Sequence, residues 1–197
     1  MDDRPQRTGR REARGPAAAR RERRARPLDA ARLDELALAY VARFATSAGK
    51  LSAYLSRKLR ERGWEGEGAP DPAAIVERMV RAGYVDDAAY ARAKGAGLLR
   101  RGYGERRVEQ ALRAAGIGED LRHEVRASEG ERRRAALALA RKRGFGPFGR
   151  EALDPARREK QIAAMLRAGH PLECARELVD AVDMDAATGW ADEAEDD

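Results

Sequence analysis

A few spacings in this sequence could in principle support catalysis or nucleotide binding. Residues 144–149 read Gly-Phe-Gly-Pro-Phe-Gly, which satisfies the glycine pattern of a dinucleotide-binding loop, and Gly49-Lys50 is similar to part of a phosphate-binding loop. The first pattern requires a preceding strand, and the second requires a hydroxyl side chain where Leu51 stands. Because the residues before 144 have a helical pattern, we expect neither loop to bind a nucleotide.

The sequence also offers few residues that could bind a metal or act as a catalytic nucleophile. His170 and Cys174 are four residues apart and could share a helix face, but two ligands do not make a zinc site. The Asp86-Asp87 pair is better explained as a helix N-cap and a first-turn acid that the helix dipole stabilises. No nucleophile, base and orienting group can be assembled by spacing. We therefore expect a non-enzyme that uses neither a metal nor another cofactor.

Charge is the feature that points to a partner. The 197 residues carry a formal net charge of +6, and this charge is unevenly placed. Residues 1–27 hold ten Arg against four acids, whereas residues 183–197 hold seven acids and no Lys or Arg. A basic middle between a basic arm and an acidic tail is common in proteins that bind polyanions. An Arg- and Ala-rich composition can also reflect a GC-rich genome, so charge alone leaves that alternative open.

The same composition indicates a compartment. No stretch approaches the roughly 18–20 apolar residues that span a bilayer, and the N-terminal residues lack the apolar segment of a secretory signal. The single cysteine, Cys174, fits a reducing compartment. We expect a cytoplasmic protein without membrane contact.

The elements that must position these residues are helices. Apolar residues recur every three or four positions from 29 to about 183, and no segment shows the two-residue alternation of a strand. N-cap pairs such as Asp71-Pro72 and Asp154-Pro155, together with glycines at helix ends, divide this stretch into nine helices. The two charged ends lack this period, so we expect them to be disordered.

One phrase recurs where helices end: a basic or small residue, then Gly, then usually an aromatic residue. Residues 76–83 also match residues 162–169 in apolar pattern and in a final Arg-Ala-Gly. These similarities predict an all-α protein of three tandem three-helix repeats, which must stack because each is too small for a good core alone. Such an array is expected to be elongated and curved. The predicted division is a basic arm (1–27), three repeats (28–84, 85–128 and 129–183) and an acidic tail (184–197).

Three stretches resemble the signatures of a known family. Residues 55–63 read Leu-Ser-Arg-Lys-Leu-Arg-Glu-Arg-Gly, residues 83–91 read Gly-Tyr-Val-Asp-Asp-Ala-Ala-Tyr-Ala, and residues 101–108 read Arg-Gly-Tyr-Gly-Glu-Arg-Arg-Val. They resemble the RecX family, regulators of the RecA recombinase. The resemblance covers about 45–183, with Val85 where Leu is usual and His170 in place of an aromatic residue.

The resemblance implies three tandem helical repeats and a function. A RecX-like protein would bind the RecA filament on single-stranded DNA and modulate, mainly inhibit, its recombinase, ATPase and coprotease activities in DNA repair and the SOS response. The expected partners are the RecA nucleoprotein filament and single-stranded DNA, with duplex DNA as a further candidate, and the expected state is a monomer.

Two alternatives remain open at this point. One is a repressor or architectural protein that binds DNA directly, without RecA, although a sequence with no Asn and three Gln is poorly equipped to read bases. The other is a helical scaffold that binds only protein.

Basic residues near the repeat junctions are the candidate filament- and DNA-binding side chains. They are Arg57, Lys58, Arg60, Arg62, Arg100, Arg101, Arg106, Arg107, Lys142 and Arg143. Along a curved array they would contact DNA phosphates or acidic filament surfaces, although about half are expected to be ordinary solvated faces. The aromatic residues Trp64, Tyr84 and Tyr103 follow glycine turns and could stack on unpaired bases, but we expect them to pack beneath the turns.

Overall fold

The computed structural model describes residues 26–151 and 153–194, and within these ranges the chain is helical with no β-strand. All nine predicted helices are present, and a tenth follows them. The helices are α2 (Ala30–Arg43), α3 (Ala48–Arg62), α4 (Pro72–Arg81), α5 (Asp87–Leu99), α6 (Glu105–Ala114), α7 (Glu119–Glu124), α8 (Glu129–Arg143), α9 (Pro155–Ala168), α10 (Leu172–Val179) and α11 (Met184–Asp192), with a 3-10 turn η1 (Gly146–Phe148). The all-α prediction is confirmed for these residues, and residues 1–25 of the predicted arm lie outside them.

The helix starts follow from the capping residues in the sequence. The carboxylate of Asp71 accepts a hydrogen bond from the Ala74 amide at 2.9 Å, and Asp154 accepts one from the Arg157 amide at 2.8 Å. In both helices a proline occupies the first position, where its missing N–H costs nothing. The side chains of Asp71 and Asp154 therefore fix where α4 and α9 begin.

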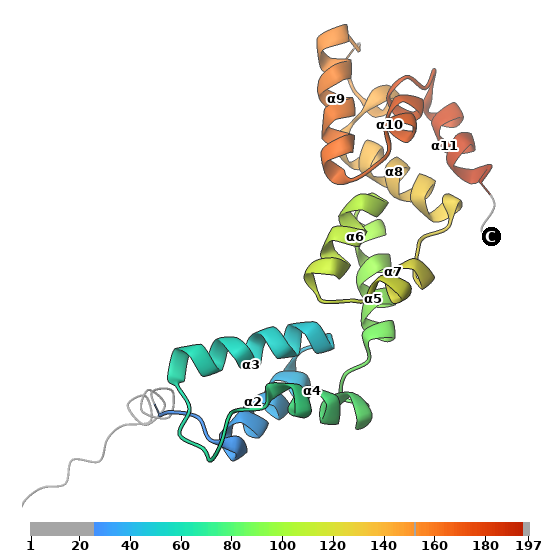
Figure 1. Cartoon of the computed structure of the whole chain (residues 1–197). Coiled ribbons are helices and arrows are strands. Elements are labelled where there is room, and N and C mark those ends of the chain that lie inside the picture. Colours follow the sequence, from blue (N-terminus) through green and yellow to red (C-terminus); the bar gives the residue numbers. More distant parts are fainter. Residues whose placement is uncertain (1–25, 152, 195–197) are drawn as a thin grey trace, which may run out of the picture.

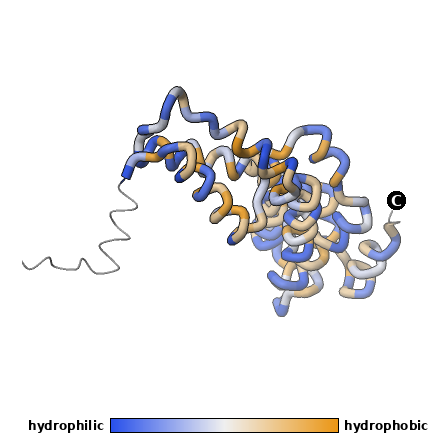
Figure 2. Tube along the Cα trace, turned by 90° about the horizontal axis from the view of Figure 1, so that it is seen from below, coloured by the Kyte–Doolittle hydropathy of each residue, from blue (hydrophilic) through white to orange (hydrophobic). Residues whose placement is uncertain are grey.

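Three separate buried clusters hold the helices in three groups. Leu33 and Leu51 belong to a cluster formed by α2, α3 and α4, and Leu98 and Leu112 to one around α5 and α6 that also packs Leu121 of α7. A third cluster, which includes Met165, joins α8 through α11. The groups follow one another along an elongated, bent molecule (Figure 1), and apolar and polar stretches alternate along the helices (Figure 2). The apolar stripes thus face three small cores rather than one large one.

The prediction that the chain is disordered from residue 184 is wrong for Met184–Asp192, which form α11. Asp183 caps this helix through the Ala186 amide at 2.7 Å, and Ala187 and Ala191 are fully buried against the third group. Arg133 of α8 stacks over the Trp190 ring at 4.8 Å and donates to the Trp190 carbonyl oxygen at 3.0 Å. The helix forms because small apolar residues one turn apart pack on α8, even though acids surround them.

The matching stretches 76–83 and 162–169 occupy different places in the fold. The first ends α4, the third helix of its group, whereas the second ends α9, the second helix of its group. The turns at equivalent places are those after α3, α6 and α9, and they centre on glycines at equal spacing along the chain. These are Gly63, Gly116 and Gly169, each with a positive φ. Tandem repetition stays a prediction, now resting on these three turns.

Candidate functional site

The first and second groups meet where the end of α6 reaches the start of α3. The Ser47 hydroxyl, which caps α3 through the Lys50 amide, also donates to the Ala115 carbonyl oxygen at 2.5 Å. A Cβ on Gly49 would lie 2.7 Å from the same carbonyl oxygen and from the Gly116 Cα. The Ala48 amide is bound by Asp87 at 2.8 Å. Gly49 therefore serves a close backbone contact, and its similarity to a phosphate loop has a structural explanation.

The second and third groups meet in the same way. The Gly104 amide, at the start of α6, donates to the Ala168 carbonyl oxygen at the end of α9 at 2.9 Å. The Arg106 amide donates to the Gly169 carbonyl oxygen at 3.3 Å. A Cβ on Gly104 would overlap the backbone of Gly169. The C-terminal end of α6 thus meets the N-terminal end of α3, and the C-terminal end of α9 meets the N-terminal end of α6. Both contacts bring opposite ends of two helix dipoles together.

The second junction also explains His170. This side chain is 1% exposed, and its Nε2 lies 3.0 Å from the Gly102 carbonyl oxygen. A carbonyl oxygen only accepts, so Nε2 carries a proton in this contact. Burial lowers the pKa of His170, and the hydrogen bond to Gly102 opposes that effect. Cys174 is half-buried, and burial raises the pKa of its thiol.

The glycine pattern at residues 144–149 also has a structural explanation. Gly144 ends α8 with a φ of 64°, and the Gly146 amide donates to the Gln161 side-chain oxygen at 2.7 Å. A Cβ on Gly146 would overlap the carbonyl oxygen of Leu178. The glycine pattern at 144–149 therefore folds the η1 turn onto the third core and leaves no backbone cradle for a pyrophosphate.

The equivalent turn of the first group, after α3, is covered by residues that precede α2. The Leu28 amide donates to the Gly63 carbonyl oxygen at 3.0 Å, and the Glu65 amide donates to the Leu28 carbonyl oxygen at 2.8 Å. The Arg62 side chain donates to the Arg26 carbonyl oxygen at 2.7 Å. Residues 26–28 therefore contact the turn after α3, which is the counterpart of the turns at the two junctions.

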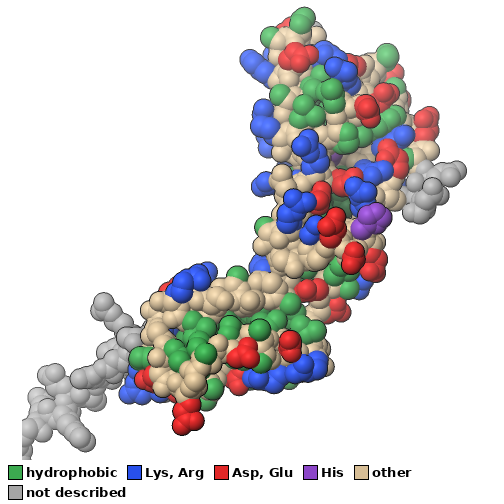
Figure 3. Space-filling view, in the orientation of Figure 1, with side chains coloured by type: hydrophobic (Ala, Val, Ile, Leu, Met, Phe, Trp, Pro, Cys, Tyr) green, Lys and Arg blue, Asp and Glu red, His purple; other side chains and the backbone are tan. Residues whose placement is uncertain are grey.

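The two junctions place α3, α6 and α9 end to end on the inner side of the bend (Figure 1). These inner helices contain twelve basic and four acidic residues, whereas α4, α7 and α10 contain four basic and six acidic residues. Lys and Arg side chains accordingly gather along the edge over α6 and α9 (Figure 3). Positive charge is thus greater on this row than on the row of α4, α7 and α10, and outside both rows α8 also carries six basic residues against two acids. We call seven of the cations on the inner helices the basic ridge: Arg57, Lys58, Arg60, Arg106, Arg107, Lys160 and Arg167.

Five of the ten predicted site residues lie on this ridge. Among them, Arg60 and Arg106 are exposed and make no ion pair within the described chain. Arg57 and Lys58 are both drawn to Glu61, at 3.6 Å and 2.5 Å. The hydrogen bond from Lys58 holds the pKa of the Glu61 carboxyl below its ordinary value, so this acid stays ionised and offsets part of their charge.

The other five predicted residues are placed differently. Arg62 is on α3 but is held by the Arg26 carbonyl group. Arg100 and Arg101 are exposed beside the second junction, and Lys142 and Arg143 are exposed at the end of α8, the first helix of its group. They are not on the inner helices, although no contact in the described chain sequesters them.

Sequence reasoning missed the cations of α9. Lys160 and Arg167 are seven residues apart on one face and exposed, whereas Arg158 is held by Asp180 through two hydrogen bonds of 2.5 Å. The signal was present, since α9 has four basic residues and one acid.

The aromatic residues at the glycine turns do not behave alike. Trp64 packs on the first core, as expected, and its Nε1 donates to the Gly68 carbonyl oxygen at 2.8 Å. Tyr84 is 61% exposed and Tyr103 is 38% exposed, so the expectation of packing is wrong for both.

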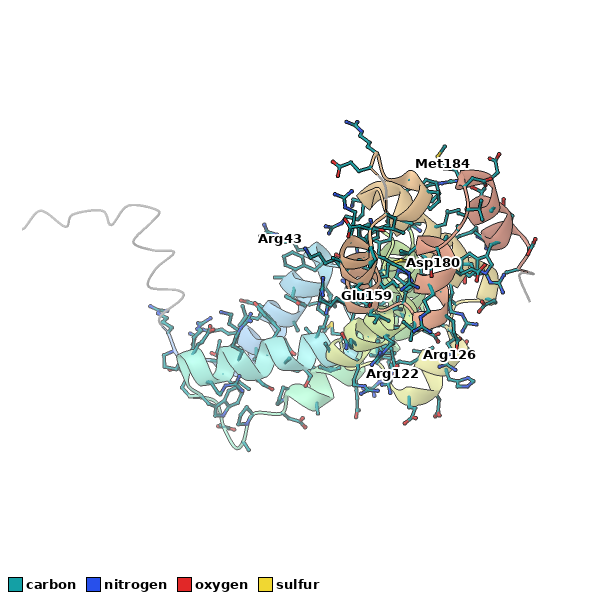
Figure 4. The ribbon with its side chains drawn as sticks, turned by 90° about the horizontal axis from the view of Figure 1, so that it is seen from above. Arg43, Arg122, Arg126, Glu159, Asp180 and Met184 are labelled. Atoms are coloured by element: carbon teal, nitrogen blue, oxygen red, sulfur yellow. The ribbon has the colours of Figure 1, made fainter. Side chains whose placement is uncertain are left out.

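A cavity of about 470 Å³ lies in the second group, between α5, α6 and α7. Gly95, Leu99 and Val108 supply an apolar lining, and Arg122 and Arg126 lie at its edge (Figure 4). More Glu than Arg side chains line it, so it is poorly suited to a phosphate. The basic ridge is the stronger candidate surface for a polyanion.

Within residues 26–151 and 153–194, no group of three or more His, Cys, Asp or Glu side chains could hold a metal ion. None of the helices in these ranges is long and apolar enough to cross a membrane.

Comparison with known proteins places the chain. A family profile described as RecX, second three-helix domain, matches residues 86–125, the segment that contains α5, α6 and α7. The curated protein "Regulatory protein RecX" of Myxococcus xanthus (strain DK1622) is 31% identical over 186 residues, which cover 86% of this chain and 97% of that relative. A match of this identity across nearly the whole relative shows common family membership, and the chain belongs to the RecX family.

Proposed function

We propose that this protein binds the RecA filament on single-stranded DNA and modulates, mainly inhibits, its recombinase, ATPase and coprotease activities in DNA repair and the SOS response. It acts in the cytoplasm as a monomer and a regulator without catalytic activity or cofactor. Family membership supports a regulatory role, because the matched relative carries that description. The observation that carries the proposal is the row of α3, α6 and α9, which presents the basic ridge along the inside of a bend.

The geometry suits a long, curved polyanion better than a compact ligand. Helices of 15, 10 and 14 residues joined end to end extend over roughly 60 Å at 1.5 Å per residue. Cations spread over such a length can meet many phosphates or acidic side chains at once. Each phosphate contact releases counterions, so binding by the ridge weakens steeply as salt rises.

A binding comparison tests the proposal. The whole protein is titrated onto RecA filaments on single-stranded DNA, onto the naked single strand and onto duplex DNA, at several salt concentrations. Tighter binding to the filament than to either naked DNA is expected. Binding to duplex alone would instead support the alternative, a protein that acts directly on DNA without RecA.

Two double variants sharpen the comparison. Charge reversal of Arg106 and Arg107 removes the centre of the ridge, and charge reversal of Arg81 and Arg176 makes the same change on exposed residues of α4 and α10. The first pair is expected to weaken filament binding at least tenfold, which corresponds to about 1.4 kcal/mol. Equal losses for both pairs would show that net charge, and not the ridge, governs binding.

A further inference from the structure

Three aromatic rings lie in a row on the first group, where α2 passes α3. The Tyr40 and Tyr54 rings are stacked, with centroids 4.3 Å apart and planes 19° from parallel. The Phe44 ring follows one turn after Tyr40, with a centroid distance of 5.3 Å and an interplanar angle of 51°. We call these three residues the aromatic platform.

Cations surround this platform on both helices. The Arg43 guanidinium lies 5.4 Å from the centroid of the Phe44 ring, and Arg57 and Lys58 lie 5.7 Å and 5.9 Å from the centroid of Tyr54. Arg57 and Lys58 also belong to the basic ridge, so the platform adjoins it. Figure 4 marks Arg43 at the end of α2.

The three rings differ in how far the first core buries them. Tyr40 and Tyr54 are half-buried and rest on the first core, which fixes their orientation. Phe44 is not part of that core and is 49% exposed. About half of this apolar ring is therefore left open to solvent, beside rings that the core holds in place.

Rings flanked by cations match the chemistry of unpaired nucleic acid. Every base offers a π-face that stacks on an aromatic ring, and each nucleotide adds a phosphate that a neighbouring cation can meet. Bases in a duplex are already stacked on one another and cannot reach the rings without unpairing. The aromatic rings therefore favour a single strand over a duplex, whereas the cations can meet the phosphates of either.

We infer that the aromatic platform is a binding site for single-stranded DNA, in which a base stacks on the exposed Phe44 ring while Arg43, Arg57 and Lys58 meet the phosphates. The inference rests on the proposed function and deepens it, by naming the part of the protein that touches the DNA strand. It also separates two tasks, since the ridge as a whole supplies charge and the platform alone supplies contacts with bases.

Naked oligonucleotides test the inference without RecA. Binding of the whole protein to a fluorescent oligo-dT strand is compared with binding to a strand of equal length that carries abasic sites. Loss of the bases should weaken binding about five- to 150-fold, because stacking on an aromatic side chain is worth roughly 1–3 kcal/mol per base. Equal affinities for the two strands would overturn the inference.

Substitutions assign the effect to residues. Phe44→Leu keeps an apolar side chain and removes the ring, and it should weaken binding to oligo-dT but not to the abasic strand. Tyr84→Leu is the matched control, because Tyr84 is a more exposed ring in the same group and no cation lies over it within the described chain. Arg43→Gln should reduce the salt dependence of binding by about 0.7 in logarithmic slope.

The outcomes separate this inference from the proposed function. Circular dichroism and thermal unfolding confirm that each variant is folded before its affinity is compared. A Phe44→Leu protein that is folded and binds oligo-dT as tightly as the unchanged protein contradicts the platform, whatever the filament measurements show. Failure to bind RecA filaments, with the loss on Phe44→Leu retained, contradicts the proposed function instead.

Discussion

Gly104 at the start of α6 packs directly against the backbone of Gly169 at the end of α9, with no room for a side chain between them. The corresponding contact between the first two groups joins Gly49 to Gly116. The row of inner helices, and with it the placement of the basic ridge, therefore depends on two sites where backbones approach closely. Gly49 and Gly104 have negative φ values, which other residues also adopt. Glycine is therefore required at these two positions because there is no space for a side chain.

Gly104→Ala should destabilise the second junction. The added Cβ overlaps backbone atoms that cannot rotate away, so we expect the free energy of unfolding to fall by about 1–3 kcal/mol in urea titrations. Gly118→Ala is the matched control, since Gly118 also caps a helix with extended backbone but has open space around it. Similar losses for the two variants would mean that the cap, and not the junction, is responsible.

Gly49→Ala tests the first junction in the same way. Its Cβ would lie 2.7 Å from the Ala115 carbonyl oxygen, so the unfolding midpoint should fall although alanine is the better helix former. Gly97→Ala, in α5, meets only the end of the flexible Arg100 side chain at 3.9 Å and should raise stability by about 0.5–1 kcal/mol. A Gly49→Ala protein more stable than the parent would contradict the close packing.

The second junction should weaken in mild acid. Burial lowers the pKa of His170 below its ordinary value of 6.5, so the unfolded chain binds a proton that the folded chain resists. The stabilisation is therefore complete above about pH 6.5 and is lost as the pH falls below that value. We expect thermal stability to decline from pH 7 to pH 5, with a smaller decline in His170→Gln. His123→Gln, which removes an exposed imidazole, should keep the slope of the parent.

Helix α11 should be necessary for the third core. A chain that ends at Asp183 exposes the surface on which Ala187, Ala191 and Trp190 pack, so it should unfold in less urea than the full chain. A chain that ends at Ala194 keeps α11 and should match the full chain. Equal stability of the two shortened chains would show that α11 contributes nothing to the core.

Most of the helices could be predicted because each one has its own capping residues and its own apolar spacing in the sequence. Asp71-Pro72 and Asp154-Pro155 mark helix starts by chemistry that acts within three residues, and apolar spacing marks the buried face. Helix α11 was missed because its apolar residues are mainly alanines among acids, and only its packing on α8 makes them a buried stripe. The signal available was Asp183 as a cap, followed by Ala187, Trp190 and Ala191 at helical spacing.

The candidate site was only partly predictable. That Arg106 and Arg107 are exposed follows from their place in an amphipathic helix, but that α3, α6 and α9 form one row does not. The row depends on contacts such as Ser47 with Ala115, between residues far apart in the chain. Equally, no spacing in the sequence brings Tyr54 onto Tyr40, because they lie on different helices.

The proposed role of the basic ridge is to act on the RecA filament. The most direct measurement is the ATPase rate of RecA on single-stranded DNA as the whole protein is added, compared with the Arg106→Glu/Arg107→Glu double variant. The rate should fall as the unchanged protein is added, and the double variant should require at least about tenfold more protein for the same inhibition while its helicity is unchanged. An ATPase rate unaffected by the unchanged protein, or inhibited equally by both proteins, would contradict the account.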